Sequence, residues 1–237
     1  MPEKTLIFSD SHLIAGDNPT VKTFKKLCTD IAPKYDQVFI LGDLFNTWLG
    51  DDLSIHTHKD LTNDLKNLST KTNVYILHGN RDFLIGRGFE QNTGVKIVYG
   101  PYLLETNSKQ YVLVHGDELC SDDIGYQRLK IVLQNPLTKF IFQKLSKKIR
   151  LKLSGQLREK SIKAQTYKSR EIMDVNPRAV QELMKKYPGA NLIHGHTHRL
   201  NTHREKNFTR YVLGDWHETG NAISIVNSVR RLEIEYN

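Results

Sequence analysis

The sequence predicts an α/β fold in which two mixed β-sheets pack against each other, with helices on their outer faces. Three features predict it: short apolar runs that each end in a polar cluster, helical patterns between the first of these runs, and alternating stretches near the C-terminus. The length of 237 residues suits one domain with an elaboration. With 38% hydrophobic and 25% charged residues, the composition is that of a globular protein and excludes global disorder.

Five apolar runs are predicted to be buried strands, because they are short, mostly rich in Val, Ile, Tyr or Phe, and followed by polar turns. They are residues 5–9 (TLIFS), 37–41 (QVFIL), 73–77 (NVYIL), 111–114 (YVLV) and 191–193 (NLI). Helical patterns at 19–32 and 57–69 lie between the first three runs. We therefore expect β-α-β crossovers and parallel pairing of these strands.

The last part of the chain, residues 200–236, is predicted to form an antiparallel meander. Short stretches of alternating apolar and polar residues occupy 209–213, 222–226 and 231–236. Alternation with a period of two is typical of strands that bury one face.

Residues 125–175 differ from the rest of the chain in charge. They contain thirteen Lys and Arg but three acidic residues, a net charge of +10 in a chain whose total is +8. The sequence therefore predicts a basic insert, 125–175, within a slightly acidic core formed by 1–124 and 176–237.

The insert is predicted to be an amphipathic helical lid. Apolar side chains recur every four residues among the cations, at Leu137, Ile141, Leu145, Ile149 and Leu153. One interpretation is a solvated helical hairpin packed over the core. The other is a lid whose apolar inner face binds acyl chains while its cations meet phosphates or anionic lipid headgroups. Nucleic acid also suits the charge, but the insert lacks a run of aromatic residues for base stacking.

The sequence also predicts the compartment in which the protein works. The two cysteines, Cys28 and Cys120, follow no metal or redox spacing, which favours thiols in a reducing compartment. The N-terminal residues lack the basic and apolar regions of a signal peptide, and no apolar run approaches a membrane span. We expect a cytosolic protein with peripheral membrane contact at most.

The polar clusters that follow the strands contain residue types that bind metal ions. Carboxylates, an amide oxygen and imidazoles suit Mn, Fe, Zn or Mg. The candidate ligands are Asp10, His12, Asp43, Asn80, His115, His196 and His198. Seven donors are too many for one tetrahedral site, but they suit two metals roughly 3.5–4 Å apart that share one carboxylate.

The order of the motifs carries more weight than any one of them. A single D-x-H or G-D is common by chance, but D-x-H, G-D, G-N-x-D, H-G-D and G-H-x-H each follow a predicted strand. Six further histidines lack such support. Of these, we expect His194 and His217 to hold metal ligands in place.

This ordered set resembles the calcineurin-like, binuclear metallophosphoesterase superfamily. Longer strings are similar to the UDP-2,3-diacylglucosamine hydrolases within it: GDLFNTWLGDD (42–52), LHGNRDFLIG (77–86), VHGDELCSDDIGYQ (114–127), IMDVNP (172–177) and LIHGHTHR (192–199). The resemblance implies the αββα sandwich of that superfamily. It also implies one metal held by Asp10, His12, Asp43 and His198, and a second held by Asp43, Asn80, His115 and His196, with Asp43 as the bridge.

By the same resemblance, the chain is expected to cleave UDP-2,3-diacylglucosamine to 2,3-diacylglucosamine 1-phosphate (lipid X) and UMP in lipid A biosynthesis. Water attacks the α-phosphorus, usually with Mn²⁺, at the cytoplasmic face of the inner membrane, and we expect a monomer that binds no nucleic acid. The implied catalytic residues are Asp43, Asn80, Arg81 and His115. The implied substrate contacts are Asn80, Arg81, Asp123, Ser161, Gln165, Lys168 and His196.

Two positions depart from the family pattern. Gln165 stands where Asn is expected, so its contact requires a slight shift of the local helix. Asn46 stands where relatives tend to have Glu, outside the ligand set.

Arg81 supports pyrophosphate cleavage independently of the resemblance. A guanidinium, with a pKa above about 12, cannot donate a proton to an alkoxide at neutral pH, but it can neutralise a pyrophosphate. An enzyme without that acid works best on a leaving group that needs no proton, such as a phosphate monoester. The alternative role for Arg81 is simple pairing with Asp82 or Asp123.

Two other functions remain open from the sequence. One is a metal-dependent nuclease or nucleotide phosphodiesterase that uses the basic insert to bind a polynucleotide. The other is a binding scaffold without catalysis, which the presence of all seven donors disfavours.

Overall fold

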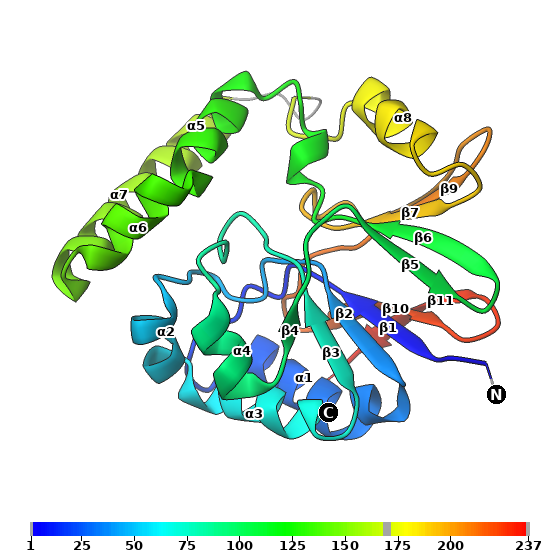
Figure 1. Cartoon of the computed structure of the whole chain (residues 1–237), viewed down its shortest axis with the longest axis horizontal. Helices are drawn as coiled ribbons and strands as arrows, with labels where there is room; N and C mark the ends of the chain where they lie inside the picture. Colours follow the sequence, from blue (N-terminus) through cyan, green and yellow to red (C-terminus); the bar gives the residue numbers. More distant parts are fainter. Residues whose placement is uncertain (1, 168–171, 236–237) are drawn as a thin grey trace.

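A computed structural model describes residues 2–167 and 172–235, and in it two β-sheets face each other (Figure 1). One sheet has six strands in the order β11-β10-β1-β2-β3-β4, and the other has five in the order β5-β6-β7-β9-β8. The strands are β1 Thr5–Phe8, β2 Gln37–Ile40, β3 Asn73–Ile76, β4 Lys96–Ile97, β5 Tyr102–Thr106, β6 Lys109–Leu113, β7 Asn191–His194, β8 Asn201–Arg204, β9 Thr209–Val212, β10 Gly220–Ile225 and β11 Val229–Ile234. The predicted α/β architecture of two mixed sheets is confirmed.

The five predicted strands are present because both of their faces are buried. On β1, Leu6 and Phe8 pack toward the helices, whereas Ile7 packs into the space between the two sheets. Successive side chains of a strand point to opposite faces, so a strand buried on both sides is a continuous apolar run. Strands β1, β2 and β3 pair in parallel, as predicted.

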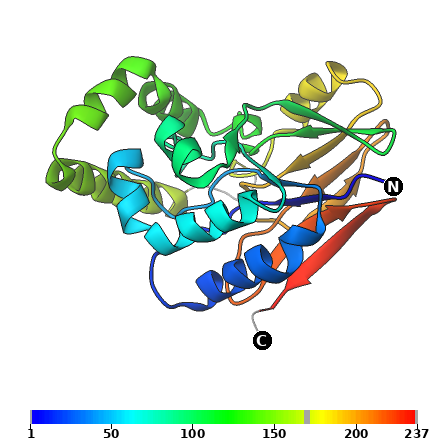
Figure 2. The same ribbon diagram turned by 60° about the horizontal axis from the view of Figure 1, so that its bottom comes forward.

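Helices cover the outer face of each sheet. Helices α1 Pro19–Lys26, α2 Asp51–Thr57, α3 Lys59–Ser69 and α4 Arg87–Thr93 lie on the side of the six-stranded sheet, and α8 Pro177–Lys185 lies against the other (Figure 2). The helix predicted at 19–32 continues after α1 as a π-helical turn, Leu27–Ile31, and a 3₁₀ turn, Ala32–Lys34. The pattern predicted at 57–69 corresponds to α3, with α2 before it.

The C-terminal meander predicted from the sequence is wrong. The tail forms two antiparallel hairpins, β8–β9 and β10–β11, which belong to different sheets. Strand β9 pairs in parallel with β7, and β10 pairs antiparallel with β1. Alternation in the sequence indicates a half-buried strand but not the strand with which it pairs. It could therefore not distinguish one antiparallel meander from two hairpins in different sheets.

The insert forms three helices, α5 Ile124–Gln134, α6 Pro136–Lys144 and α7 Lys147–Thr166, which we call the cap. The single stripe of apolar residues expected along it is interrupted, because Leu145 has an extended backbone between α6 and α7. Leu137 and Ile141 of this stripe are 66% and 55% exposed. The cap is therefore helical, as predicted, but the stripe does not lie on one continuous helix.

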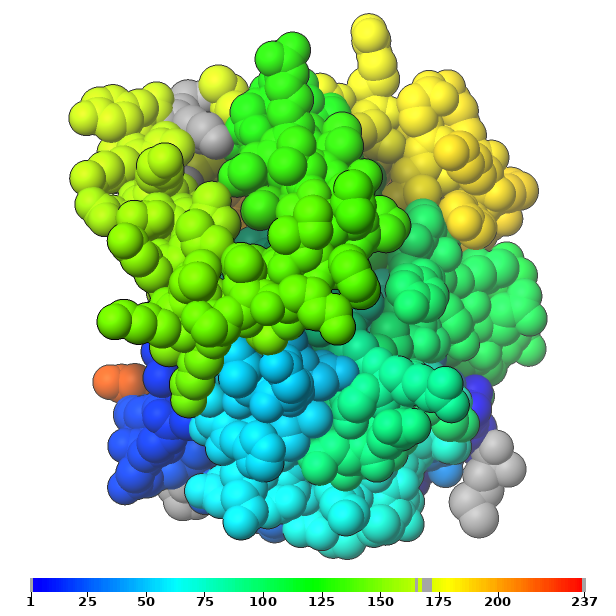
Figure 3. Space-filling model, turned by 60° about the vertical axis from the view of Figure 1, so that its left-hand side comes forward, coloured from blue at the N-terminus to red at the C-terminus, as the bar shows by residue number. Residues whose placement is uncertain are grey.

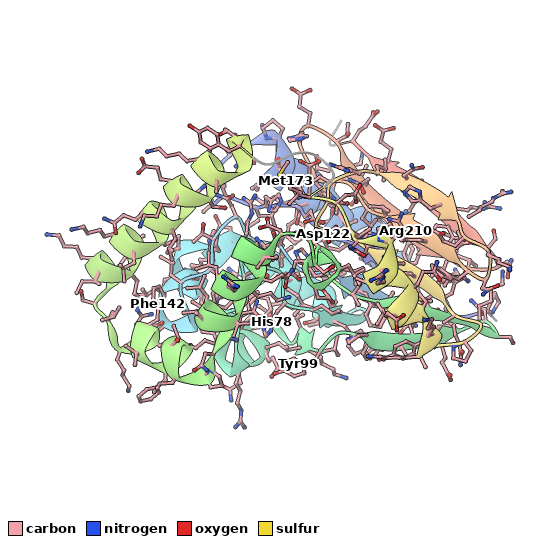
Figure 4. The ribbon with its side chains drawn as sticks, turned by 90° about the horizontal axis from the view of Figure 1, so that it is seen from above. His78, Tyr99, Asp122, Phe142, Met173 and Arg210 are labelled. Carbon is pink, nitrogen blue, oxygen red and sulfur yellow. The ribbon has the colours of Figure 1, made fainter. Side chains whose placement is uncertain are left out.

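The cap contacts the core at both of its ends. The first end, which we call the stem, is where the chain leaves the core before α5 and returns to it before α8. There, Asn176 donates a hydrogen bond to Asp122 (2.7 Å), and Lys130 of α5 pairs with the buried Asp117 (2.8 Å). Asp122 and Met173 mark this stem in Figure 4, and Phe142 marks the opposite end, where it packs against the core. Figure 3 shows the cap resting on the segment around α2.

At the far end of the cap, Arg150 ties α7 to the first turn of α2 and to the loop before it. It is 4% exposed, and its guanidinium pairs with both carboxylate oxygens of Asp52 (2.8 and 2.9 Å). It also donates to the backbone carbonyls of Leu49, Gln143 and Leu145.

Among the helices that the structure describes, none has the length and apolarity needed to cross a membrane.

We predict that Arg150→Ala loosens the far end of the cap by about 1–3 kcal/mol, because three backbone carbonyls lose their donor. Hydrogen exchange of the α6 and α7 amides measures this as faster exchange in the variant. Asp52→Asn is the matched control: Asp52 is 58% exposed, so loss of its charge is expected to cost under about 1 kcal/mol. Equal effects of the two variants would contradict the dominant role of the carbonyls.

Candidate metal centre

The seven predicted donors lie in five loops that follow strands of both sheets. Asp10 and His12 follow β1, Asp43 follows β2, Asn80 follows β3, His115 follows β6, and His196 and His198 follow β7. Strands β6 and β7 are parallel, as are β1 to β3, so their carboxyl ends deliver these loops to one edge of the sandwich.

The backbone is strained at this edge. Asp10, His12, Asp43, His196 and His198 all have positive φ, between 45° and 66°. Residues with a side chain rarely adopt this region; each such residue costs on the order of 1–3 kcal/mol and persists only where the surrounding structure enforces it. The strain falls on five of the seven predicted ligands, as expected where geometry is fixed for function.

The donor atoms converge in two groups. In the first, His198 Nε2 lies 3.1 Å from His12 Nε2 and 3.3 Å from Asp10 Oδ1. In the second, Asn80 Oδ1 lies 3.1 Å from His115 Nε2 and 2.9 Å from His196 Nδ1.

Asp43 lies between the two groups. Its Oδ2 is 3.9 Å from His12 Nδ1, and its Oδ1 is 3.8 Å from His115 Nε2. Asp10, Asp43 and His115 also place one donor atom each within 4.8 Å of one another, as do Asp10, His12 and His198. Asp43 is thus placed where a bridging ligand would be needed.

The donors fit divalent cations. Asp10 Oδ1 and His12 Nδ1 are buried, and neither has a hydrogen-bond partner among the described residues; the approach of His198 to Oδ1 lacks hydrogen-bond geometry. Buried polar atoms are normally satisfied, so orphaned donors that point into a ligand cluster favour a cation there. The chemistry of carboxylate, amide and imidazole suits hard or borderline metals.

The two carboxylates are electrostatically different. Burial raises the pKa of Asp43 to about 7, with the negative charges of Asp82 and Asp10 adding to the effect. Burial would also raise the pKa of Asp10, but the approach of His198 and the positive charges of His115 and His198 hold that pKa well below its usual value. A cation beside Asp43 would favour its ionised form.

The imidazoles divide into two classes. Burial lowers the pKa of His12 and His196 to about 3, helped by the positive charges of Arg81 and His115 respectively, so both rings are neutral at neutral pH, the form in which an imidazole can bind a cation. Burial acts in the same direction on His115 and His198, but neighbouring carboxylates outweigh it. The pKa of His115 rises to about 9 beside Asp43 and that of His198 to about 10 beside Asp10 and Asp215.

Hydrogen bonds orient two of these rings. His115 Nδ1 lies 2.7 Å from the carbonyl oxygen of Leu41, which can only accept, so Nδ1 carries a proton and Nε2 faces the cluster. His198 Nδ1 lies 3.2 Å from Asp215. A carboxylate behind a ligating imidazole is a common way to fix its orientation.

Sequence reasoning missed Asp215 and Asp82. Asp215 follows β9 in a G-D pair, the same kind of signal that identified Asp43. Asp82 is fully buried and accepts hydrogen bonds from Gly79 N and Leu44 N (2.8 Å each), which ties the loops after β2 and β3 together. Its place in G-N-R-D was visible, but its role as a backbone clamp was not.

The two histidines expected to hold ligands in place contact neighbours of the predicted ligands His198 and His196. His217 Nε2 lies 3.1 Å from Asp215, which itself contacts His198. His194 is buried and its Nδ1 lies 2.9 Å from the carbonyl oxygen of Gly195, the residue before His196.

Arg81 is held beside the cluster. Its Nε lies 3.5 Å from Asp43 Oδ2, and its Nη1 donates to Asn46 Oδ1 at 2.9 Å. The side-chain partners of Arg81 among the described residues are thus Asp43 and Asn46, whereas Asp82 accepts from backbone N–H groups, so the structure does not support simple pairing of Arg81 with Asp82.

The structure describes only some of the substrate contacts predicted in the cap and its stem. Asp123 caps α5 by accepting from Tyr126 N (3.0 Å), and Ser161 is an exposed residue of α7. The Gln165 side chain and Lys168 lie outside the described residues. Arg158 of α7 was missed by sequence reasoning: partial burial and the positive charge of Arg81 lower its pKa, so the Arg158 guanidinium lies close enough to Arg81 to be affected by that charge.

Comparisons with known proteins match these findings. The calcineurin-like phosphoesterase family model matches residues 3–200. The chain is 39% identical to UDP-2,3-diacylglucosamine hydrolase from Shewanella loihica over 93% of this chain and 92% of that protein. It is 36% identical to the enzyme of the same name from Histophilus somni, over 94% and 96% of the two chains.

Solved structures share the fold. A novel archaeal phosphodiesterase has a TM-score of 0.52 at 12% identity, covering 98% of this chain and 99% of its own. A dimetal phosphatase from Danio rerio has a TM-score of 0.50 at 13% identity, with full coverage of both chains.

We predict that Gly195→Ala destabilises the protein by about 1–3 kcal/mol, because the added Cβ would overlap Asp10 Oδ2 and Ser9 Oγ. Gly155→Ala is the matched control: among the described residues, and apart from its own stretch of helix, no heavy atom lies within 4 Å of its Cβ position in α7, so a gain of about 0.5–1 kcal/mol is expected. Thermal or denaturant unfolding measures both. A Gly195→Ala protein as stable as the wild type would show that Asp10 is not tightly packed against this loop.

Proposed function

The chain belongs to the calcineurin-like phosphoesterases, and among them to the UDP-2,3-diacylglucosamine hydrolase family, and from this premise we propose that it hydrolyses the pyrophosphate bond of UDP-2,3-diacylglucosamine. The products are 2,3-diacylglucosamine 1-phosphate and UMP. The observation that carries the proposal is the identity of 39% along 93% of the chain, because a match of that length includes the cap as well as the metal loops.

The metal centre of this proposal uses the seven converging donors. Asp10, His12, Asp43 and His198 would hold one cation, and Asp43, Asn80, His115 and His196 would hold the other, with Mn²⁺ as the proposed metal. When bound, two such cations lower the pKa of a coordinated water and neutralise charge on the reacting phosphate. The orphaned Asp10 Oδ1 and His12 Nδ1 support the first site, and the contacts of Asn80 Oδ1 with both imidazoles support the second.

Arg81 is the fixed positive charge of the reaction. It lies beside Asp43, so its guanidinium can pair with the diphosphate whose α-phosphorus is attacked. The leaving group, a phosphate monoester, needs no proton, which agrees with a residue that cannot supply one. Arg158 adds a second guanidinium: the repulsion between the two is relieved when an anion lies between them.

The remaining substrate contacts come from the cap and its stem. We assign Asp123, Ser161, Gln165 and Lys168 to the uridine and glucosamine parts of the substrate, together with Asn80, Arg81 and His196. Asp123 is the N-cap residue of α5, where the cap leaves the core, and Ser161 lies three residues from Arg158 on α7, so these positions can face the site from the cap side.

The insert, 125–175 in a core of 1–124 and 176–237, binds the acyl chains and the membrane through the cap. Of its side chains, Ile131, Val132, Leu137 and Phe140 are 58–71% exposed, and they lie among the cations that give this segment its net charge of +10. Apolar side chains with surrounding Lys and Arg favour an anionic lipid surface. We therefore place the protein, as a monomer, at the cytoplasmic face of the inner membrane.

The exposed apolar side chains also argue against a nuclease. A polynucleotide groove requires cations for phosphates and aromatic faces for bases. The large exposed side chains of the cap are mostly aliphatic: Ile131, Val132, Leu137, Ile141 and Leu151 are between 51% and 71% exposed.

The test is hydrolysis of UDP-2,3-diacylglucosamine with Mn²⁺ in ¹⁸O-labelled water, beside single-stranded DNA and a chromogenic phosphodiester. We expect turnover of the lipid with ¹⁸O in UMP, because water attacks the α-phosphorus. Mass spectrometry of the products measures this. Label in the lipid phosphate would contradict attack at that atom, and absence of lipid turnover with cleavage of DNA would replace this function with the nuclease.

A further inference from the structure

Asn46 lies three residues after Asp43, in a segment that is fixed from both sides. Its backbone N–H donates to the carbonyl oxygen of Leu13 (3.0 Å), and Leu13 and Phe45 form a parallel bridge while fully buried. The position of Asn46 is therefore set by the same loop that carries Asp10 and His12.

From this position Asn46 holds the side chain of Arg81. Its Oδ1 accepts from Arg81 Nη1 at 2.9 Å, while Asp43 Oδ2 lies 3.5 Å from Nε. The backbone of Arg81 is held as well, since its N–H donates to Asp43 Oδ1 (2.8 Å) and its carbonyl accepts from Trp48 N (3.2 Å). Both ends of Arg81 are thus tied to the loop after β2.

This arrangement leaves Arg81 free to bind an anion. A guanidinium has five N–H donors. Nε faces Asp43 and one Nη1 hydrogen goes to Asn46, so three donors have no partner among the described residues. The side chain is 34% exposed, so these donors are accessible to a ligand. An arginine already held in place loses less side-chain entropy when it binds.

The chemical nature of the acceptor matters too. An amide oxygen takes a hydrogen bond without cancelling the charge of the guanidinium, whereas a carboxylate at the same place would attract it and oppose a phosphate. Asn46 therefore orients Arg81 and leaves its charge for the substrate.

We propose that Asn46 is a positioning residue, which aims the free N–H groups of Arg81 at the diphosphate of the substrate. This inference rests on the proposed function. The proposal assigns two separate effects to Asn46. The hydrogen-bond acceptor at position 46 determines kcat, the turnover rate of the enzyme–substrate complex. The absence of a charge on the Asn46 side chain determines the affinity for the diphosphate, measured as KM.

The experiment compares Asn46→Leu with Asn46→Asp in Mn²⁺-loaded enzyme turning over UDP-2,3-diacylglucosamine. Leu keeps the branched shape at Cγ but removes the acceptor, so kcat is expected to fall about tenfold with little change in KM. Asp restores the acceptor but adds a negative charge, so kcat is expected to return to within about threefold while KM rises about threefold to tenfold. A purely structural role for Asn46 predicts no such division between kcat and KM.

Arg81 must carry both effects. In an Arg81→Gln background, Asn46→Leu is expected to change kcat by less than about twofold, because there is no guanidinium left to orient. The proposal is overturned if Asn46→Leu keeps the wild-type kcat, if Asn46→Asp loses as much kcat as Asn46→Leu, or if the Leu effect persists without Arg81.

A measurement without substrate separates this inference from the proposed function. The side-chain Nε–H signal of Arg81, assigned by its loss in Arg81→Lys, is observed by ¹⁵N NMR. A slowly exchanging signal in wild type and Asn46→Asp that broadens in Asn46→Leu supports the positioning role even if the lipid is not turned over. An identical signal in all three proteins overturns it, whatever the enzyme hydrolyses.

Discussion

The rest of the structure depends on the burial of two carboxylates, Asp10 and Asp43, between the edges of two sheets. They are 0% and 2% exposed, and burying a charge is costly unless opposite charges compensate it. Four imidazoles and the guanidinium of Arg81 surround them. Five of the predicted ligands have a positive φ, so bringing these groups together requires a strained backbone. Two divalent cations would complete this compensation. The carboxylates thus explain why so many donors converge on one place.

The cap is connected to the same centre. Asp117, which pairs with Lys130 of α5, lies two residues after His115, and Asp52, which pairs with Arg150, lies nine residues after Asp43. Each attachment therefore begins on a segment that also carries a predicted metal ligand. A cap held in this way presents its apolar and cationic side chains at a fixed position over the loops that carry the predicted metal ligands.

The donors were predictable because each follows an apolar run that is buried on both faces, and such runs reveal strand ends without a structure. What the sequence could not show depends on pairing and on backbone geometry. The tail hairpins choose different sheets, the cap breaks at Leu145, and Asp82, Asp215 and Asn46 act through hydrogen bonds between loops that are distant along the chain. Positive φ at the ligands is likewise a tertiary property, because local preference opposes it.

The central claim is that these loops form a two-cation centre bridged by Asp43. Calorimetric titration of chelator-treated protein with Mn²⁺ tests it most directly, because it counts ions without requiring a substrate. We predict two Mn²⁺ per wild-type chain, and a loss of at least one of them in a folded Asp43→Ala variant. A single ion per wild-type chain, or two ions bound equally well by Asp43→Ala, would contradict the account.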